Sequence, residues 1–256
     1  MNLKESEEIL NKGYKVIPFP SELPKIMIAH IMSYIAEITK QRELSSVMSL
    51  SDEEFIRKFH KGFRIFPSHI SQQISNWVEG FATILGGVKT AINFVSAYEI
   101  SKNPSLKKNT IDSFWRCVRP GKPDVGAAHC DYQFWEIAKG TDEDPGKPFE
   151  YDERWKIWIP LVGCNHQTSL QVIPGSHTEE IPIDYLQTKN GVKPSITPEW
   201  LAKNEHRFLC PFEKFTNSCV LFHDKLVHRG PPNPCEEVRL SSELTILLKL
   251  EESAVI

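Results

Sequence analysis

Residues 238–250 read VRLSSELTILLKL, and this stretch decides the fold because its side chains divide into two different strand faces. Successive side chains of a β-strand point to opposite faces. One face here is almost wholly apolar and must pack on a core, whereas the other begins with Arg239 and Ser241. If that face lines an interior, Arg239 needs an anion, because an unpaired interior charge costs several kcal/mol. Glu243 lies roughly 13 Å away along the strand, too far to supply one.

The rest of the chain changes in texture near residue 110. Upstream, residues 21–41 have apolar side chains at helical spacing, with Ser21 in the N-cap position. Ser51-Asp-Glu-Glu is a capping-box pattern that predicts a second helix, and residues 68–85 predict a third. Downstream, proline, glycine and short alternating segments predict a β region. The predicted strands are 14–19, 112–119, 155–162, 170–173, 217–223 and 238–250.

No segment of the sequence reads as a linker, so we expect one domain over residues 1–256. In it, residues 1–110 form a mostly helical support and residues 111–250 form the β core. Two long connections, 136–154 and 178–204, lack a strand pattern, and long loops in a compact domain usually serve binding.

The composition excludes several classes of function. The chain has 256 residues, of which 40% are hydrophobic and 25% charged, as in ordinary globular proteins. A net charge of −3 does not favour a nucleic-acid partner. The sequence contains neither a long apolar run nor a secretory signal, so we expect a cytoplasmic protein without a membrane partner. The six cysteines form no Cys-x-x-Cys pair, which argues against structural zinc. Nothing in the sequence indicates the oligomeric state.

One triplet, His129-Cys130-Asp131, carries metal-binding chemistry. In an extended segment, residues two apart point the same way, so its histidine and aspartate can reach one ion. Two imidazoles and one carboxylate on one side of a metal suit Fe(II) and O2. The third ligand is then His223 or His228. The triplet alone is weak evidence, because such histidines are more often capping or surface residues. The triplet is more informative together with the distant histidine and Arg239, which follow it in this order along the chain.

From residue 114 to 250 the chain resembles the phytanoyl-CoA dioxygenase family of Fe(II)- and 2-oxoglutarate-dependent oxygenases. The matching elements follow the family's order over somewhat more than half of the chain. They are specific for the family but not for any substrate within it. They are His129-Cys130-Asp131, Lys156 to Leu161 (KIWIPL), Val172 to His177 (VIPGSH), Val220 to His223 (VLFH), Val227 to Asn233, and Arg239.

This resemblance implies a mainly β fold, the double-stranded β-helix or cupin-like jelly-roll barrel, with N-terminal helices packed on one sheet. It assigns His129, Asp131 and His228 to Fe(II), as metal ligands and catalytic residues. It assigns Arg239 to the distal carboxylate of 2-oxoglutarate. His228 is favoured over His223 because the family's iron histidine precedes a Gly/Pro/Asn turn.

The chain departs from the family pattern after the iron histidine. Small hydroxyl residues are common there, whereas this chain has Arg229 and Gly230. Ser241, on the strand face of Arg239, is expected to supply that hydroxyl to the co-substrate. Trp158 is expected either to face the lumen beside the co-substrate or to be a core residue.

The sequence leaves more than one role for several residues near these motifs. Arg116 and Arg119 could meet a substrate anion or the C1 carboxylate of 2-oxoglutarate, or lie on the surface. The side chain of Cys130 is expected to pack in the interior. The aromatic residues that follow the triplet are expected either to line a substrate entrance or to lie in the core. Those aromatic residues are Tyr132, Phe134 and Trp135.

The resemblance therefore predicts an Fe(II)- and 2-oxoglutarate-dependent dioxygenase that hydroxylates a small polar metabolite with O2, releasing succinate and CO2. Asp131 argues against the halogenating variant, in which a small residue replaces the carboxylate. Three alternatives stay open: a cupin-type metal hydrolase, isomerase or lyase; a non-catalytic ligand-binding barrel; and an oxygenase that desaturates or epimerises.

Overall fold

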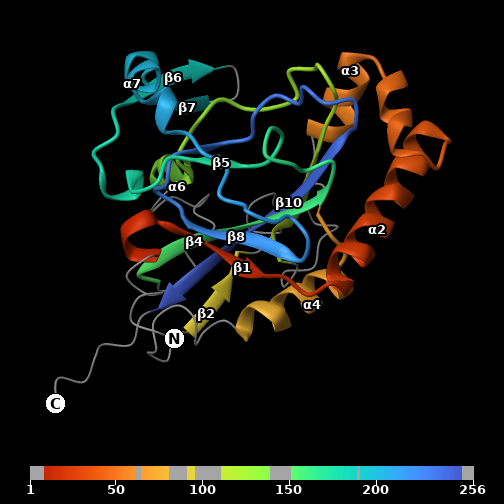
Figure 1. Cartoon of the computed structure of the whole chain (residues 1–256), viewed down its shortest axis with the longest axis horizontal. Coiled ribbons are helices and arrows are strands. Elements are labelled where there is room, and N and C mark those ends of the chain that lie inside the picture. The colour runs from red at the N-terminus through yellow and green to blue at the C-terminus, as the bar shows by residue number, and fades with distance from the viewer. Residues whose placement is uncertain are drawn as a thin grey trace.

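The computed structural model describes residues 9–60, 65–80, 91–95, 111–138, 151–188 and 191–249. Its centre is a six-stranded antiparallel sheet in the order β1-β8-β4-β10-β2, with β3 also paired to β10 (Figure 1). The strands are β1 (Tyr14–Pro18), β2 (Ala91–Phe94), β3 (Ser113–Val118), β4 (Glu153–Val162), β8 (Ser218–His223) and β10 (Arg239–Lys249).

The predicted strands are therefore present, with ends that differ by a few residues. The predicted mainly β class with helices is confirmed. A smaller antiparallel sheet pairs β5 (Gln171–Val172) with β9 (His228–Arg229). Within the described ranges the two sheets do not join into a closed barrel.

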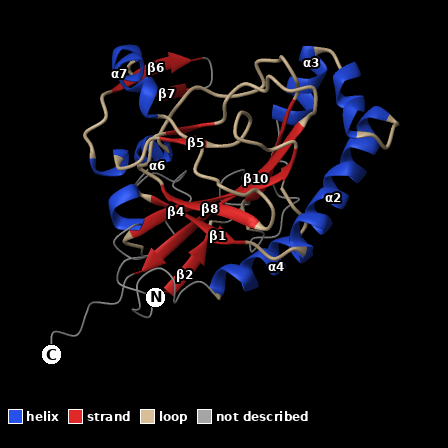
Figure 2. Cartoon of the chain, in the orientation of Figure 1, coloured by secondary structure: helices blue, strands red, loops and turns tan. Residues whose placement is uncertain are grey.

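Helices cover one face of the major sheet (Figure 2). In α2 (Glu22–Thr39) the residues at helical spacing on one side are fully buried, and the helix ends at Lys40, whose φ of 61° is left-handed. α3 (Asp52–Phe55) begins with the predicted capping box, in which Ser51 and Glu54 satisfy each other's backbone N–H groups. It continues as a π-helical turn, Ile56–His60, and α4 (Ser68–Glu79) follows. Ser21 precedes α2 but its side chain makes no cap, contrary to the prediction.

The connection 178–204 contains regular structure, which the sequence did not predict. Its elements are a hairpin of β6 (Ile183–Thr188) and β7 (Gly191–Ile196), followed by α7 (Pro198–Asn204). Tyr185 and Leu186 are both exposed, so neither face of the hairpin is buried uniformly and no alternation is visible. Most of the other long connection, residues 139–150, lies outside the described residues.

Three apolar clusters fix these layers. The largest joins the helices to the major sheet. A second lies between the sheets and includes Trp158, Val172 and Phe222. A third includes Cys130 and Val227 and lies beside the β6–β7 hairpin and α7. No helix in the described ranges has the length and hydropathy needed to cross a bilayer.

Candidate metal centre

Backbone pairing between distant segments brings two histidines together. His129 and His228 form an isolated antiparallel bridge, in which each backbone N–H donates to the other residue's carbonyl at 3.0 Å. Their ring centroids are 4.5 Å apart. The Oγ of Ser176 accepts a hydrogen bond from the backbone N–H of Val227 at 2.9 Å, which holds the segment that carries His228. The structure thus selects His228, not His223, as the partner of His129.

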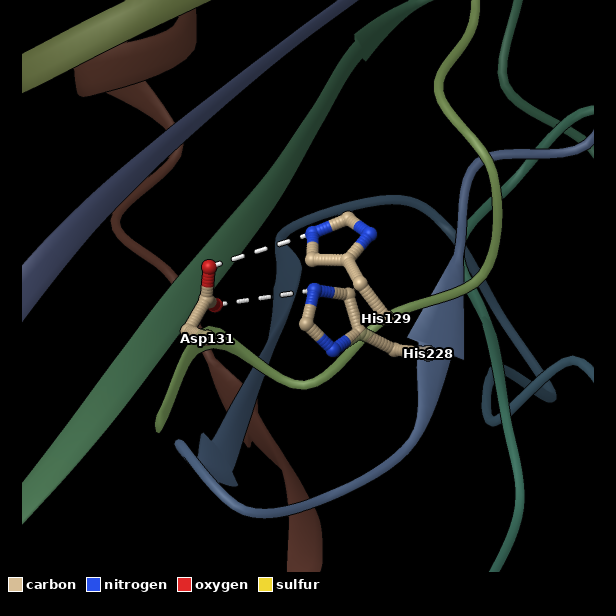
Figure 3. A group of neighbouring side chains, drawn as sticks. All are labelled: His129, Asp131 and His228. Carbon is tan, nitrogen blue, oxygen red and sulfur yellow. Dashed lines mark ion pairs between the residues drawn. The ribbon is translucent and has the colours of Figure 1, made fainter. Parts of the chain in front are cut away.

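Asp131 reaches the same point by a different route from the one predicted. His129 is extended, but Asp131 is the first residue of helix α6 (Asp131–Ala138), so the triplet is not a continuous strand. The chain bends between the two residues and still turns both side chains to one side, as Figure 3 shows. The Asp131 oxygens lie 3.8 Å from His129 Nε2 and 3.5 Å from His228 Nε2.

The tautomers of the two imidazoles suit metal binding. His129 Nδ1 lies 2.8 Å from the carbonyl of Ala127, and His228 Nδ1 lies 2.9 Å from the carbonyl of Leu226. Each Nδ1 must carry its proton to donate there, which leaves Nε2 with a free lone pair. Both Nε2 atoms face Asp131 (Figure 3).

The protonation states agree with this arrangement. Burial lowers the pKa of His228 to about 4, so it is neutral at neutral pH. Burial alone would raise the pKa of Asp131, but the positive charge of Lys156 holds it well below its ordinary value. One ligand atom of each residue, His129, Asp131 and His228, lies within 4.8 Å of the others, and together they form a group that could hold a metal ion.

Two orphaned atoms test whether the residues fit iron and 2-oxoglutarate. Asp131 Oδ2 is buried and has no hydrogen-bond partner among the described residues, as expected for a carboxylate oxygen that binds a cation. Arg239 is 3% exposed and its Nη1 donates to the carbonyls of Thr168 and Pro231, whereas its Nε has no partner among the described residues. No carboxylate of the described residues pairs with it, so an anionic ligand would stabilise this buried guanidinium. The donor set therefore fits both groups.

A cavity of about 90 Å³ connects these two places. Ser241 is buried in its wall, opposite Arg116 and Pro160 in strand register. Trp158 also lines the cavity, 4% exposed, and packs against Phe212. Both side chains are thus where a co-substrate between Arg239 and the metal ligands would meet them.

Gly230 explains the departure from the family pattern after the iron histidine. A Cβ atom there would lie 3.0 Å from Arg239 Nη2. The missing side chain leaves space for the guanidinium. Arg229 points elsewhere, to Gln171 and Glu205.

Other candidates have structural roles. His223 lies beside Trp155, which faces the helices, and its Nδ1 accepts a hydrogen bond from the backbone of Lys225. Arg119 is 1% exposed and forms a buried pair with Asp124, so it is neither at the surface nor available to an anion.

The aromatic residues of α6 have different surroundings. Phe134 is 40% exposed and meets the His129 ring edge-on at 5.8 Å, so it is not a core residue. Tyr132 and Trp135 instead meet the cations of Lys225 and Arg154. Cys130 is buried in an apolar cluster, as expected, and burial raises its pKa to about 12.

A buried ion pair that the sequence did not predict lies beside the candidate metal ligands. Lys156 Nζ lies 3.4 Å from Glu243 Oε1 and 3.8 Å from Asp131 Oδ2, and it donates to Thr245 Oγ1 at 3.1 Å. The register of β4 on β10 puts Lys156 opposite Thr245. The alternation of residues 153–162 would have placed Lys156 on the face of Trp158 and so given a signal for it.

Comparisons with known proteins identify a family for this chain. A family model described as phytanoyl-CoA dioxygenase matches residues 88–241, more than half of the chain. No curated protein matches the sequence.

Solved structures share the fold at low identity. EctD from S. alaskensis with bound Fe is 15% identical with a TM-score of 0.52, over 96% of this chain and 76% of that one. The non-heme monooxygenase ThoJ is 12% identical with a TM-score of 0.54, and the match covers 96% of this chain and 79% of ThoJ. The epimerase SnoN, in complex with Fe3+, alpha-ketoglutarate and nogalamycin RO, is 13% identical with a TM-score of 0.51, over 98% and 86%.

Proposed function

Because the chain belongs to the phytanoyl-CoA dioxygenase family, we propose that it is an Fe(II)- and 2-oxoglutarate-dependent dioxygenase that hydroxylates a small polar metabolite. One observation carries the proposal. Two imidazole nitrogens and a carboxylate converge on one point, and the cavity lined by both imidazoles is also lined by Arg239, a buried guanidinium that pairs with no carboxylate of the described residues. The structures of EctD with Fe and of SnoN with Fe3+ and alpha-ketoglutarate support the same assignment.

His129 and His228 would hold iron through Nε2, and Asp131 through its carboxylate. Arg239 would bind the distal carboxylate of 2-oxoglutarate with charge-assisted hydrogen bonds. Ser241 would add a hydroxyl hydrogen bond. When bound, iron and 2-oxoglutarate activate O2 together, releasing succinate and CO2 and adding one oxygen atom to a substrate C–H bond.

The protein's own part is to orient the reactants and exclude water. Trp158 and Leu170 give the cavity an apolar wall, while the charges of iron, Asp131, the keto acid and Arg239 cancel. A neutral loaded site avoids the burial penalty that separate ions would carry. Because this wall excludes water, the contact between Arg239 and the keto acid is stronger than it would be in solvent.

Loading the protein anaerobically with Fe(II) and 2-oxoglutarate, then screening metabolites for substrate-stimulated succinate release, tests the proposal. A metal hydrolase, isomerase or lyase would bind the metal without releasing succinate. A non-catalytic binding barrel would show no turnover with any metabolite. Mass spectrometry of the product separates hydroxylation from desaturation and epimerisation.

Substitution Asp131→Ala removes the only carboxylate of the metal group. Its effect on turnover should exceed the roughly 100-fold upper range for residues that merely support a metal ligand. Iron binding, measured by metal analysis after gel filtration, should fall with it. Asp184→Ala, at an exposed position on β6, is the matched control and should change neither. Full turnover by Asp131→Ala would contradict the proposed iron site.

A further inference from the structure

Arg116 lies on the cavity wall beside the candidate metal centre, where the proposed reaction gives it no role. It is opposite Ser241 in the register of β3 on β10, so the two side chains share a face of the sheet. The same cavity is lined by His129, His228 and Glu243. A cation is thus held at the edge of the space a substrate must enter.

The guanidinium of Arg116 has unused hydrogen-bonding capacity. Its Nε lies 3.7 Å from Glu243 Oε2, longer than a hydrogen bond, and its side chain is 44% exposed. No acceptor in the described ranges takes a hydrogen bond from it. Arg119, three positions along, donates to Asp124, Asp52 and the carbonyl of Leu50. The fork of Arg116 is therefore open, whereas that of Arg119 is occupied.

Glu243 has a second counterion besides Arg116: against the effect of burial, first Lys156 and then Arg116 hold the pKa of Glu243 below its ordinary value. Lys156 is closer to that carboxylate, at 3.4 Å against 3.7 Å, and its side chain is only 6% exposed. Lys156 is also tied to Thr245 Oγ1, so it is fixed beside Glu243. With Glu243 neutralised from the buried side, the positive charge of Arg116 is available to a ligand.

We propose that Arg116 binds an oxyanion of the substrate, a carboxylate or a phosphate, and so selects anionic substrates. This inference rests on the proposed function. A guanidinium fork matches the two oxygens of such a group and binds them in a bidentate manner. The half-exposed position of Arg116 suits a group that arrives from solvent. The buried position of Arg239, 3% exposed, suits the co-substrate.

The test uses the protein of residues 1–256 loaded anaerobically with Fe(II) and 2-oxoglutarate, whose chelate has a visible absorption band. The probes are small anions (acetate, glycolate and methyl phosphate) and two neutral analogues, acetamide and ethylene glycol. Binding beside the metal changes the band, so no turnover is needed. Methyl phosphate against the two carboxylates distinguishes the two kinds of oxyanion.

The anions, but not the neutral analogues, should perturb the band of the wild-type protein. Arg116→Gln should weaken that response at least tenfold, and Arg116→Lys should recover part of it. The affinity of Arg116→Gln for 2-oxoglutarate should stay within about twofold of the wild-type value. A tenfold loss would instead indicate that an interaction of about 1.4 kcal/mol with the co-substrate had been removed. Arg57→Gln is the matched control, because Arg57 is exposed and does not line the cavity.

Three results would overturn the inference: no response of the wild-type band to any anion, an undiminished response in Arg116→Gln, or an equal loss of 2-oxoglutarate affinity. The last would assign Arg116 to the co-substrate. Failure of the wild-type protein to form the band at all would instead count against the proposed function. Circular dichroism establishes that each variant is folded.

Discussion

The two faces of the major sheet use alternate residues of the same strands, yet only one of them carries charged residues that line a cavity. On β10, Leu240 and Leu244 are fully buried against the helices. Arg239, Ser241 and Glu243 occupy the other face and line the cavity. Apolar burial stabilises the fold, whereas burying ions costs free energy unless each is paired. The difference teaches that the helix-side face supplies stability and the cavity-side face supplies binding.

Lys156→Met should show the largest effect on stability, because it breaks the charge balance of the cavity-side face. Asp131 and Glu243 raise the pKa of Lys156 against the effect of burial, so it is charged in the folded protein. Removing one partner of a buried pair typically costs about 3–5 kcal/mol. We expect that loss in the free energy of unfolding of the metal-free protein, measured with urea.

Lys249→Met is the control for that variant, since Lys249 pairs with Asp152 at 3.6 Å while 44% exposed. An exposed pair contributes about 0–1 kcal/mol. A divalent cation should stabilise Lys156→Met more than the wild type, because it restores a positive charge at Asp131. Equal stability of the two variants would show that the cavity-side charges are not buried in solution.

Leu244→Ala tests the helix-side face. Leu244 has no exposed surface and belongs to the cluster that joins helices and sheet. Such truncations cost about 2–5 kcal/mol through lost burial and the cavity that remains. Leu186→Ala, at a half-exposed hairpin position, should change the free energy of unfolding by less than about 0.5 kcal/mol. Folded Leu244→Ala should bind iron normally; loss of iron binding would mean that the faces are not separable.

The sequence predicted the helix-side face well because period-two alternation is a local signal. Residues 238–250 identify both faces of β10 without reference to any other strand. Among the candidate metal ligands, His129 and Asp131 were predictable from a short motif, whereas the choice of His228 over His223 came from the family resemblance. Even so, Asp131 lies on a helix and not in the strand assumed for it, since a bend after His129 is invisible to alternation.

The Lys156–Glu243 pair could not be predicted in the same way. Its members are far apart in sequence, and they approach only through the register of β4 on β10, which shifts between Leu240 and Ser241. Glu243 was therefore weighed only against Arg239 on its own strand. Interactions across strands require a register that the sequence of one strand does not contain.

Arg239→Lys sharpens the binding half of the comparison. Lysine keeps the charge but loses the planar fork, and a hydrogen bond to a charged group is worth about 1.5–3 kcal/mol. We expect the dissociation constant of 2-oxoglutarate to rise about 10- to 100-fold, measured anaerobically by titrating the chelate band. Arg207→Lys, in a surface pair with Glu179, should leave it unchanged. An unchanged constant in Arg239→Lys would place the distal carboxylate elsewhere.

Asp112→Asn should give the smallest effect, one confined to a pH window. Burial raises the pKa of Asp112 from 3.8 to about 6, although Lys156 opposes the shift. The folded protein therefore favours the protonated form, and stability is lost as the pH rises from about 4 through about 6. This pKa shift corresponds to at most about 3 kcal/mol in the free energy of unfolding. The gain in Asp112→Asn should be smaller, because the variant also loses the attraction between Asp112 and Lys156. Relative to wild type, the free energy of unfolding of Asp112→Asn should therefore be higher at pH 7 than at pH 4. A difference that does not change with pH would show that Asp112 is ionised in the fold without penalty, and that the charged face tolerates a further carboxylate.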